Sequence, residues 1–319
     1  MTDKTHVIGV DLGGTNTVFG LVDGSHNIVA TDSIPTQKFH DAGEFADQSA
    51  KAILQLARKA GGTDRIRGIG IGAPCGNFNA GTIEHAANLA WAKGIVPICE
   101  MLQERLDIQA LITNDAKAAA MGEMKYGAAR GMKNFIEITL GTGVGSGIVA
   151  DGRLLYGSDG FAGELGHTIF DFSPKGRPCG CGRSGCLDMY CSSRGVVITA
   201  GEILSQSDCP STLRQMDGKE ISPLDIFNAA EQGDLVGREV FRKTGEILGM
   251  ACANFATFLS PEAFVFFGGV AKAGHWLLDP AKETYDKYVL SLYKDKAEFL
   301  VSSLDDNSAA ILGAAALVP

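Results

Sequence analysis

A histidine and a group of closely spaced cysteines point most directly to chemistry. His167 is followed by Cys179, Cys181 and Cys186, which together offer one imidazole and three thiolates. Such a set closes a tetrahedral zinc site of the structural kind, with no position left for water. The small residues between the sulfurs let the loop wrap around a single ion. The sequence therefore predicts a structural Zn²⁺ site with these four ligands.

Other interpretations of the cysteines stay open at this point. They could be free thiols buried in a core or a redox pair, and Cys191 is a possible substitute ligand. A disulfide staple is disfavoured, because the N-terminus lacks the basic start and longer apolar stretch of a signal peptide. We therefore expect a cytoplasmic protein in a reducing compartment, where disulfides are rare.

The net charge limits the classes of partner. The chain carries a formal charge of -9. We expect no nucleic-acid partner, because such binding needs basic clusters that displace counterions. The acidic balance also argues weakly against docking on anionic membranes, and no apolar run approaches the roughly 20 residues that span a bilayer. A chain of 319 residues is expected to form two domains.

Three glycine-rich turns each follow an apolar strand: DLGGTNT, LGTGVGSG and FGGVAKAG. Glycine lets the backbone approach a phosphate and point several N–H groups at it. Thr15 and Thr142 add hydroxyl donors, and Asp11 could hold a metal ion directly or through water. Each turn could instead be only a tight connection. None of them fits the Walker pattern or a clean G-x-G-x-x-G followed by a helix.

Several polar residues lie at strand ends or in loops. Asn114 and Asp115 end a strand and open a helix, where the positive helix end keeps Asp115 ionised. A carboxylate there could accept a proton from a hydroxyl that attacks phosphorus, or could simply cap the helix. Glu164 could face one pocket with His167 or be a surface charge. Asn88 could hold a hydroxylated ligand or form a turn.

Strands and helices alternate along the chain, which predicts an α/β architecture with a mixed sheet. The expected strands cover 5–11, 15–22, 28–36, 66–74, 108–115 and 262–269, where the last one ends in a glycine pair, and the expected helices cover 44–60, 97–106, 115–127, 235–259 and the C-terminal segment. Leu12-Gly13 aligns with Leu140-Gly141, and Asp23-Gly24 with Asp151-Gly152. Two strand–glycine turn–strand units at this separation suggest a duplicated domain.

Taken together, the motifs resemble those of a known family. DLGGTNT, NDAKAAAMGE, LGTGVGSGIV, GELGHT, CGCGRSGCLD and FFGGV occur in the order typical of the ROK sugar kinases. The chain resembles this family over nearly its full length. The stretch GAPCGNFNAGTIEHAANLAW is most similar to the bacterial glucokinases of the family.

The resemblance implies an actin-like, ribonuclease H-like ATPase fold of two domains with a cleft between them. Such proteins are usually dimers or tetramers, and their domains close over a hexose and Mg²⁺-ATP. We expect an N-terminal α/β domain of residues 1–117 plus 305–319, to which the final helix returns. Residues 118–304 then form a larger C-terminal α/β domain that carries the zinc loop.

The resemblance also implies a role for each matching residue. Asp115 corresponds to the catalytic base, and the zinc ligands are those described above. The positions that bind sugar hydroxyls correspond to Asn88, Asn114, Asp115, Glu164 and His167. The phosphate turns correspond to Asp11, Gly13, Gly14, Thr15, Gly141, Thr142 and Gly143, and the adenosine side to Gly268 and Gly269. For His167 we expect one ring nitrogen on zinc and the other on the sugar.

One position departs from the family pattern. A glutamate that touches the sugar normally follows the last zinc cysteine, in a GCLE pattern, whereas this chain has Asp188. The side chain is one methylene shorter, so a sugar contact by Asp188 needs a shifted backbone or an intervening water.

The expected function is ATP-dependent phosphorylation of a hexose at the 6-hydroxyl, with glucose as the leading substrate. The alternatives are N-acetylglucosamine, N-acetylmannosamine, fructose or allose, and a sugar-responsive repressor of the same family. Repressors carry a winged-helix domain before the first phosphate motif. Because Asp11 lies close to the start of this chain, the kinase is favoured.

Overall fold

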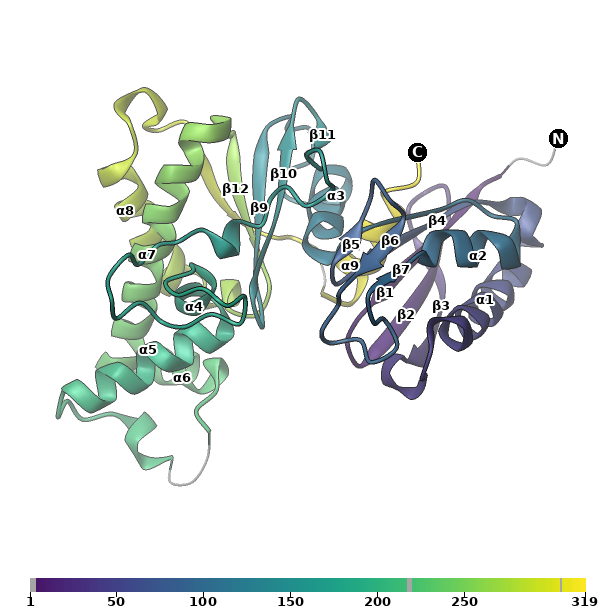
Figure 1. Ribbon diagram of the computed structural model, residues 1–319. Helices are drawn as coiled ribbons and strands as arrows, with labels where there is room; N and C mark the ends of the chain where they lie inside the picture. Colours follow the sequence, from purple (N-terminus) through teal and green to yellow (C-terminus); the bar gives the residue numbers. More distant parts are fainter. Residues whose placement is uncertain (1–3, 217–219, 305) are drawn as a thin grey trace. The chain divides into compact units, whose positions relative to one another are not determined.

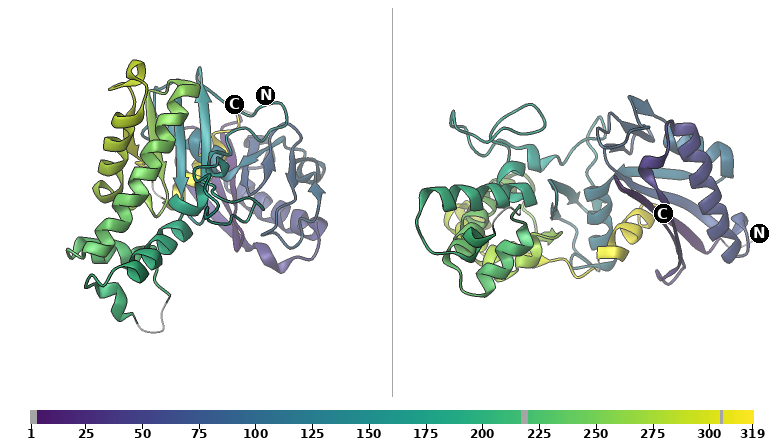
Figure 2. Two further views of the ribbon diagram at one scale, coloured as in Figure 1. Left: turned by 60° about the vertical axis from the view of Figure 1, so that its left-hand side comes forward. Right: turned by 90° about the horizontal axis from the view of Figure 1, so that it is seen from below.

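Two five-stranded sheets organise the chain, one in each of two units (Figures 1 and 2). The computed structural model describes residues 4–216, 220–304 and 306–319. Unit 1 comprises residues 1–131, 154–163 and 303–319, and unit 2 comprises residues 132–153 and 164–302. The expectation of a two-domain α/β fold is confirmed.

The sheet of unit 1 is mixed and has the strand order β3-β2-β1-β4-β8. The first three strands pair antiparallel, and β4 and β8 continue the sheet in parallel from β1. The strands are β1 (His6–Leu12), β2 (Asn16–Val22), β3 (Ile28–Pro35), β4 (Ile66–Ala73) and β8 (Ala110–Asn114). A small antiparallel sheet adds β5 (Gly76–Asn77), β6 (Thr82–Glu84) and β7 (Ile95–Val96).

Alternate residues of β1 face two different helical layers, as the two-residue period of a strand requires. Ile8, Val10 and Leu12 join the core cluster formed with α1 (Ala42–Lys59) and α2 (Ile98–Leu106). The opposite face, where Val7 and Gly9 lie, is covered by α9 (Asp306–Ala315), which also packs against α3 (Asp115–Tyr126). The final helix therefore belongs to unit 1, as expected.

Glycines in β1 and β4 bring α9 unusually close to this sheet. A Cβ placed on Gly9 would collide with the carbonyl of Ile311, and one on Gly70 with the carbonyl of Ala314. Gly313 in turn lies against the carbonyl of Ala118 in α3. At these glycines the backbone of the last helix packs directly on strand and helix backbone.

The sheet of unit 2 repeats the arrangement, with strand order β11-β10-β9-β12-β13. The strands are β9 (Phe135–Leu140), β10 (Val144–Ala150), β11 (Arg153–Leu154), β12 (Ala263–Phe267) and β13 (Glu298–Val301). β9 and β10 form an antiparallel hairpin, and β12 and β13 continue in parallel from β9. The two glycine hairpins occupy equivalent places in their sheets, which supports the suggested duplication.

Helices form most of the remaining core of unit 2. They are α4 (Asp188–Cys191), α5 (Ser193–Gln206), α6 (Pro223–Glu231), α7 (Leu235–Leu259) and α8 (His275–Tyr288). The long helix α7 packs against α8 over much of its length and also against α5 and α6. A capping box of Ser222 and Asp225 begins α6, where the side chain of each residue accepts the other's backbone N–H.

Short 3-10 turns connect several of these elements. They are η1 (Thr36–Lys38), η2 (Thr63–Arg65), η3 (Leu165–His167), η4 (Thr212–Gln215), η5 (Ala271–Ala273) and η6 (Ser291–Tyr293). Within the described residues, no helix combines the length and apolar character needed to cross a bilayer.

The bounds of the units differ from the domain bounds that we predicted. The first crossing lies at residues 131/132 instead of 117/118, so that all of α3 belongs to unit 1. Residues 154–163 also belong to unit 1, because Asn77 Nδ2 donates to the Asp159 carbonyl (2.9 Å) and Lys117 Nζ to the Gly160 carbonyl (3.0 Å). The predicted bounds at residues 1 and 305 lie outside the described residues.

Gly70→Ala is expected to loosen α9 and to lower the free energy of unfolding by about 1–3 kcal/mol, because the added methyl overpacks a backbone contact. The measurement is chemical denaturation followed by circular dichroism. The matched control is Gly201→Ala on α5, where a Cβ meets nothing within 4 Å; it should be neutral or slightly stabilising. Equal midpoints for the two variants would contradict the close packing of α9.

Candidate functional site

The first glycine turn joins β1 to β2 and is bound to two other segments of unit 1. Gly13 N–H donates to the Asn16 carbonyl at 3.1 Å, which closes the turn. The amide Nε2 of Gln37 donates to the carbonyls of Gly14 and Asn88, each at 2.6 Å. Gln37 therefore holds the predicted phosphate turn beside the loop that carries Asn88.

The Asn88 loop is fixed to the core of unit 1 by an aromatic anchor. Trp91 is buried and stacks on Phe45 with ring centroids 4.0 Å apart, and its Nε1–H donates to the Thr36 carbonyl at 3.1 Å. Asn88 itself is exposed, with its Nδ2 3.4 Å from the point where a Cβ on Gly14 would lie. The amide is thus available to a ligand beside the turn.

Two carboxylates lie at the carboxyl ends of parallel strands in unit 1. Asp11 ends the β1 register opposite Gly72 of β4, and β4 pairs in turn with β8, which ends at Asn114 just before Asp115. A Cβ on Gly72 would lie 3.8 Å from the Cα of Asp115. The strand between the two acidic residues therefore has no side chain at this point, and their charges interact.

The electrostatics of the two carboxyls follow from this placement. Desolvation and, to a smaller extent, the charge of Asp115 raise the pKa of Asp11 from 3.8 to about 6. Desolvation also raises the pKa of Asp115, although backbone N–H bonds at the start of α3 act in the opposite direction. Asp115 stays accessible to solvent. An accessible carboxylate with a raised pKa suits a general base.

The side chains of Asn114 and Asp115 both cap the start of α3. Ala116 N–H donates to Asn114 Oδ1 at 2.9 Å and to Asp115 Oδ1 at 2.8 Å. The capping alternative for these residues therefore holds, but it uses one oxygen of each side chain. The Nδ2 of Asn114 and the Oδ2 of Asp115 are the atoms left to meet a substrate.

The second and third glycine turns lie side by side in unit 2. Gly141 N–H donates to the Gly143 carbonyl at 3.0 Å, which closes the β9–β10 turn. Gly268, at φ 95°, packs against the Leu140 carbonyl, to which Val270 N–H also donates at 3.1 Å. Unit 2 therefore presents two glycine turns at the carboxyl ends of the adjacent strands β9 and β12.

The predicted zinc ligands come together. The ligand atoms of His167, Cys179, Cys181 and Cys186 all lie within 4.8 Å of one another. Cys179 Sγ is 3.8 Å from His167 Nδ1, and Cys181 Sγ is 3.6 Å from Cys186 Sγ. Ligands about 2.3 Å from a tetrahedral ion lie roughly 3.8 Å apart, so the four atoms fit a single metal ion.

The loop thiols and Cys191 lie in different surroundings. Hydrogen bonds from Arg183 lower the pKa of the Cys181 thiol, whereas burial raises the pKa of Cys186. Cys191 is fully buried near the Thr244 carbonyl and outside this cluster, and its pKa is raised by burial. The structure therefore favours Cys186 over Cys191 as the fourth ligand.

Glu164 and His167 lie at the two ends of η3, which packs on the second hairpin. His167 N–H donates to the Glu164 carbonyl at 3.0 Å, and Leu165 N–H to Ser146 Oγ at 3.2 Å. Because Nδ1 of His167 faces Cys179, Nε2 is the nitrogen left for another partner. This agrees with the expected division of the ring between metal and ligand.

Asp188 lies on the second glycine turn. Its Oδ1 accepts a hydrogen bond from Val144 N–H at 2.6 Å. The carboxylate is therefore engaged with the backbone of a predicted phosphate turn, an interaction that the sequence did not predict.

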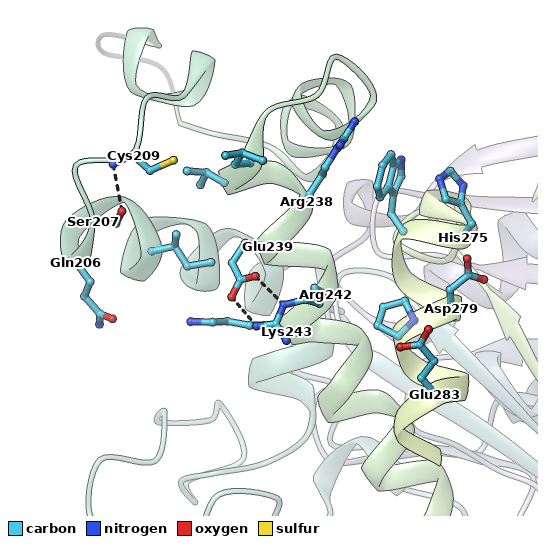
Figure 3. Close-up of a pocket in the computed structure, with 15 residues that line it drawn as sticks. Gln206, Ser207, Cys209, Arg238, Glu239, Arg242, Lys243, His275, Asp279 and Glu283 are labelled. Carbon is cyan, nitrogen blue, oxygen red and sulfur yellow. Dashed lines mark hydrogen bonds and ion pairs between the residues drawn. The ribbon is translucent and has the colours of Figure 1, made fainter. Parts of the chain in front are cut away.

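One sizeable cavity has none of the predicted residues in its lining. A cavity of about 810 Å³ opens between α5, α7 and α8 (Figure 3). Both cationic and anionic side chains line it, and Arg242 pairs with Glu239 at 2.6 Å. The predicted residues are divided between the units: Asp11, Gly13, Gly14, Thr15, Asn88, Asn114 and Asp115 lie in unit 1, and the others lie in unit 2.

Sequence reasoning missed Gln37 and the turn contact of Asp188. Gln37 lies in η1 within a stretch, PTQK, that carries no motif. Its role depends on a contact with residue 88, which is distant in sequence, so no local pattern could reveal it.

Two α/β units, each with a glycine hairpin in the same place of its sheet, are typical of the class of actin-like ATPase folds. The particular family follows from the comparisons: the ROK family matches residues 7–319, and the chain belongs to it.

Relatives in this family include kinases and repressors. A glucokinase of Halalkalibacterium halodurans is 37% identical, over 100% of this chain and 96% of its own length. The ROK family glucokinase of Streptomyces griseus, solved with glucose and AMPPNP, is 32% identical with a TM-score of 0.78, over 98% of this chain and 99% of that one. A xylose repressor of Caldicellulosiruptor bescii is 30% identical, over 99% of this chain and 78% of its own length.

Asp11→Asn is expected to stabilise the fold at neutral pH. The pKa of Asp11 is raised in the folded protein, so folding loses stability as the pH rises from about 4 to about 6. The variant removes this cost and should raise the free energy of unfolding at pH 7.5 by on the order of 1 kcal/mol, an advantage that disappears below about pH 4.

Urea denaturation at several pH values measures this difference. The exposed Asp64→Asn serves as control and should shift the midpoint little at any pH. An Asp11→Asn variant that is less stable than wild type at pH 7.5 would contradict a charge cost at this position.

Proposed function

We propose that the chain is a glucokinase that transfers the γ-phosphoryl group of ATP to the 6-hydroxyl of glucose. The observation that carries this proposal is the pair of carboxylates in unit 1, of which Asp115 is accessible and has a raised pKa. The glucokinases among the relatives, at 30–37% identity over nearly the whole chain, support glucose as the substrate.

Asp115 accepts the proton of the 6-hydroxyl late in a loose transition state. Its Oδ1 is held by the N–H of Ala116, which fixes the carboxylate at the helix start and leaves Oδ2 for the substrate. The raised pKa brings the carboxylate closer in basicity to the group that it deprotonates. Asn88, Asn114, Glu164 and His167 bind the other hydroxyls of the sugar.

The glycine turns hold the nucleotide. Gly13, Gly14, Thr15, Gly141, Thr142 and Gly143 direct N–H and hydroxyl donors at the phosphates, and Gly268 and Gly269 lie on the adenosine side. Asp11 suits a divalent cation, because burial and the neighbouring carboxylate of Asp115 make its negative charge costly and a cation relieves that cost. When bound with ATP, Mg²⁺ neutralises charge on the transferred phosphoryl group.

The cluster of His167, Cys179, Cys181 and Cys186 holds a structural Zn²⁺. Its donor set of one imidazole and three thiolates, with ligand atoms within 4.8 Å of one another, supports zinc over other metals. The zinc orders the loop that carries His167 and takes no part in phosphoryl transfer. We further propose a cytoplasmic homodimer or homotetramer with no nucleic-acid or membrane partner.

Asp115→Asn is expected to lower kcat by at least about 10³-fold while the Kd for glucose changes by less than fivefold, because the amide keeps the shape but cannot accept the proton. A coupled assay of ADP release, run over glucose, N-acetylglucosamine, N-acetylmannosamine, fructose and allose, measures turnover and substrate choice together. Calorimetry measures glucose binding.

The matched control is Asp107→Asn, at the left-handed end of α2, where asparagine is well tolerated. Normal turnover of Asp115→Asn would exclude it as the base. Wild-type protein that binds hexose but releases no ADP with any sugar would favour the sugar-responsive regulator instead.

Cys181→Ser is expected to lose zinc and to lower Tm by roughly 4–8 °C, which corresponds to about 2 kcal/mol in a unit of this size. Metal analysis after purification without chelator should find about one equivalent of zinc in the wild type. Cys209→Ser, at a thiol outside the cluster, should keep both the zinc and the Tm. Less than about half an equivalent in the wild type would contradict the zinc site.

A further inference from the structure

Asp188 reaches the second glycine turn because the turn has no side chain where the carboxylate arrives. Its Oδ1 accepts from Val144 N–H at 2.6 Å, and a Cβ on Gly143 would lie 3.0 Å from the same oxygen. A hydrogen bond from an N–H to a carboxylate is about twice as strong as one between neutral groups. The first residue of β10 is therefore fixed by a side chain from α4.

The first residue of α5, which follows α4 directly, holds the same turn. Ser193 N–H donates to the Gly141 carbonyl at 2.8 Å, and Ser192 N–H donates to the Asp188 carbonyl at 3.2 Å. The turn is thus held at two points, one on each side of Thr142, by Asp188 of α4 and by the start of α5. Neither contact involves a side chain that the phosphate role of the turn requires.

The zinc loop fixes the start of α4. Asp188 is two residues after the ligand Cys186, and Leu187 N–H between them donates to the carbonyl of Thr168, the residue after His167, at 2.9 Å. The two ligand segments therefore meet directly at the residue that precedes Asp188.

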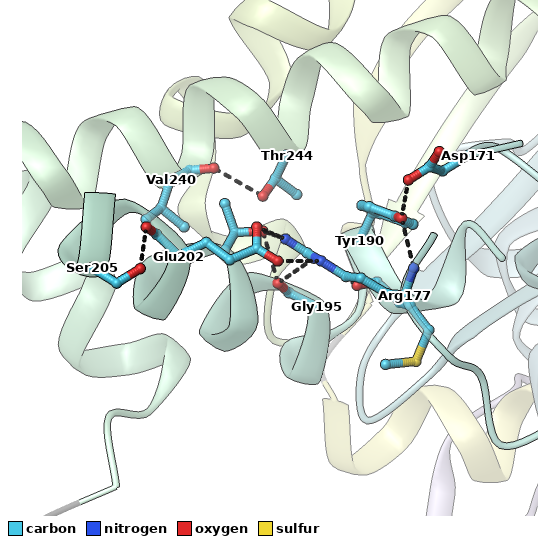
Figure 4. A network of polar contacts seen from close by, with 10 residues as sticks. Asp171, Arg177, Tyr190, Gly195, Glu202, Ser205, Val240 and Thr244 are labelled. Atoms are coloured by element: carbon cyan, nitrogen blue, oxygen red, sulfur yellow. Dashed lines mark hydrogen bonds and ion pairs between the residues drawn. The ribbon is translucent and has the colours of Figure 1, made fainter. Parts of the chain in front are cut away.

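Arg177, within the zinc loop, ties that loop to both helices that follow (Figure 4). Its guanidinium donates to the Met189 carbonyl at 2.7 Å and to the Gly195 carbonyl at 3.1 Å, and pairs with Glu202 at 2.6 Å. The same group stacks over the ring of Tyr190 at 4.5 Å. Movement of the loop must therefore move α4 and, with it, the carboxylate of Asp188.

We propose that Asp188 is a positioning residue for the second glycine turn, which it links to the zinc loop, and that it is not a ligand of the sugar. This rests on the proposed function, since the turn binds nucleotide phosphate. Aspartate is shorter than the glutamate of the family pattern, and this changes the role of the residue. The carboxylate of Asp188 accepts the hydrogen bond from Val144 N–H, whereas a glutamate would place its carboxylate one methylene further from the backbone.

Three substitutions separate positioning from sugar binding. Asp188→Asn keeps an acceptor for Val144 N–H and should leave the Kd for Mg-ADP within about threefold. Asp188→Ala removes the acceptor and should weaken Mg-ADP binding about 10- to 100-fold, as expected for a lost hydrogen bond to a charged group. Asp188→Glu should resemble the alanine variant, because the extra methylene displaces the carboxylate from the turn. In all three, the KM for glucose should stay within threefold.

Hydrogen exchange supplies a readout that does not depend on activity. The amide of Val144 should exchange at least tenfold faster in Asp188→Ala than in wild type and nearly normally in Asp188→Asn. Removal of zinc from wild-type protein by a chelator should also speed exchange in residues 141–145. The matched control is Asp208→Ala, on an exposed carboxylate, which should change neither exchange nor binding.

Two results would overturn the inference: a KM for glucose that rises more than the Kd for Mg-ADP in the asparagine and alanine variants, or unchanged Val144 exchange in Asp188→Ala. If the alanine variant does not fold, the asparagine and glutamate pair carries the same comparison. Failure of the proposed function is distinct, because wild-type protein would then phosphorylate no hexose while the exchange measurement still reports on the turn.

Discussion

Two like charges close together in unit 1 set the main constraint on the chain. Asp11 and Asp115 lie at the carboxyl ends of β1 and β8, with only the glycine backbone of β4 between them. Their desolvation costs stability, and nothing among the described contacts of Asp11 is a basic side chain. The cap of α3 fixes one oxygen of Asp115, and α9 packs on α3 and on the glycine face of β1 and β4, the elements that carry the two carboxylates or lie between them.

Local patterns predicted much of this from the sequence. Buried strands, the capping box of α6 and the full length of α7 each follow from residues that are near neighbours, so apolar spacing and cap chemistry were sufficient. The metal cluster was also predictable, because three of its four ligands lie within one short loop. Three cysteines so close together, with a histidine nearby, are typical of a metal site.

The features that local patterns missed depend on contacts between distant segments. Gln37 joins residues 14 and 88, and Asp188 joins α4 to residue 144, each through hydrogen bonds between its side chain and the backbone. The bounds of the units were similarly hidden, since residues 154–163 are assigned to unit 1 by Asn77 and Lys117. A polar side chain in a loop has many possible partners, and only the fold selects one.

The path of the chain through its two units has a consequence for how the protein is made. Unit 1 is built from three separate stretches, the last of which begins at residue 303. During synthesis the sheet of unit 1 therefore stays incomplete, because the glycine face of β1 and β4 is uncovered until α9 leaves the ribosome. Unit 2 has no such need for the final residues and can finish first. The N-terminal half of the sequence thus completes its fold last, which reverses the usual order of domain folding on the ribosome.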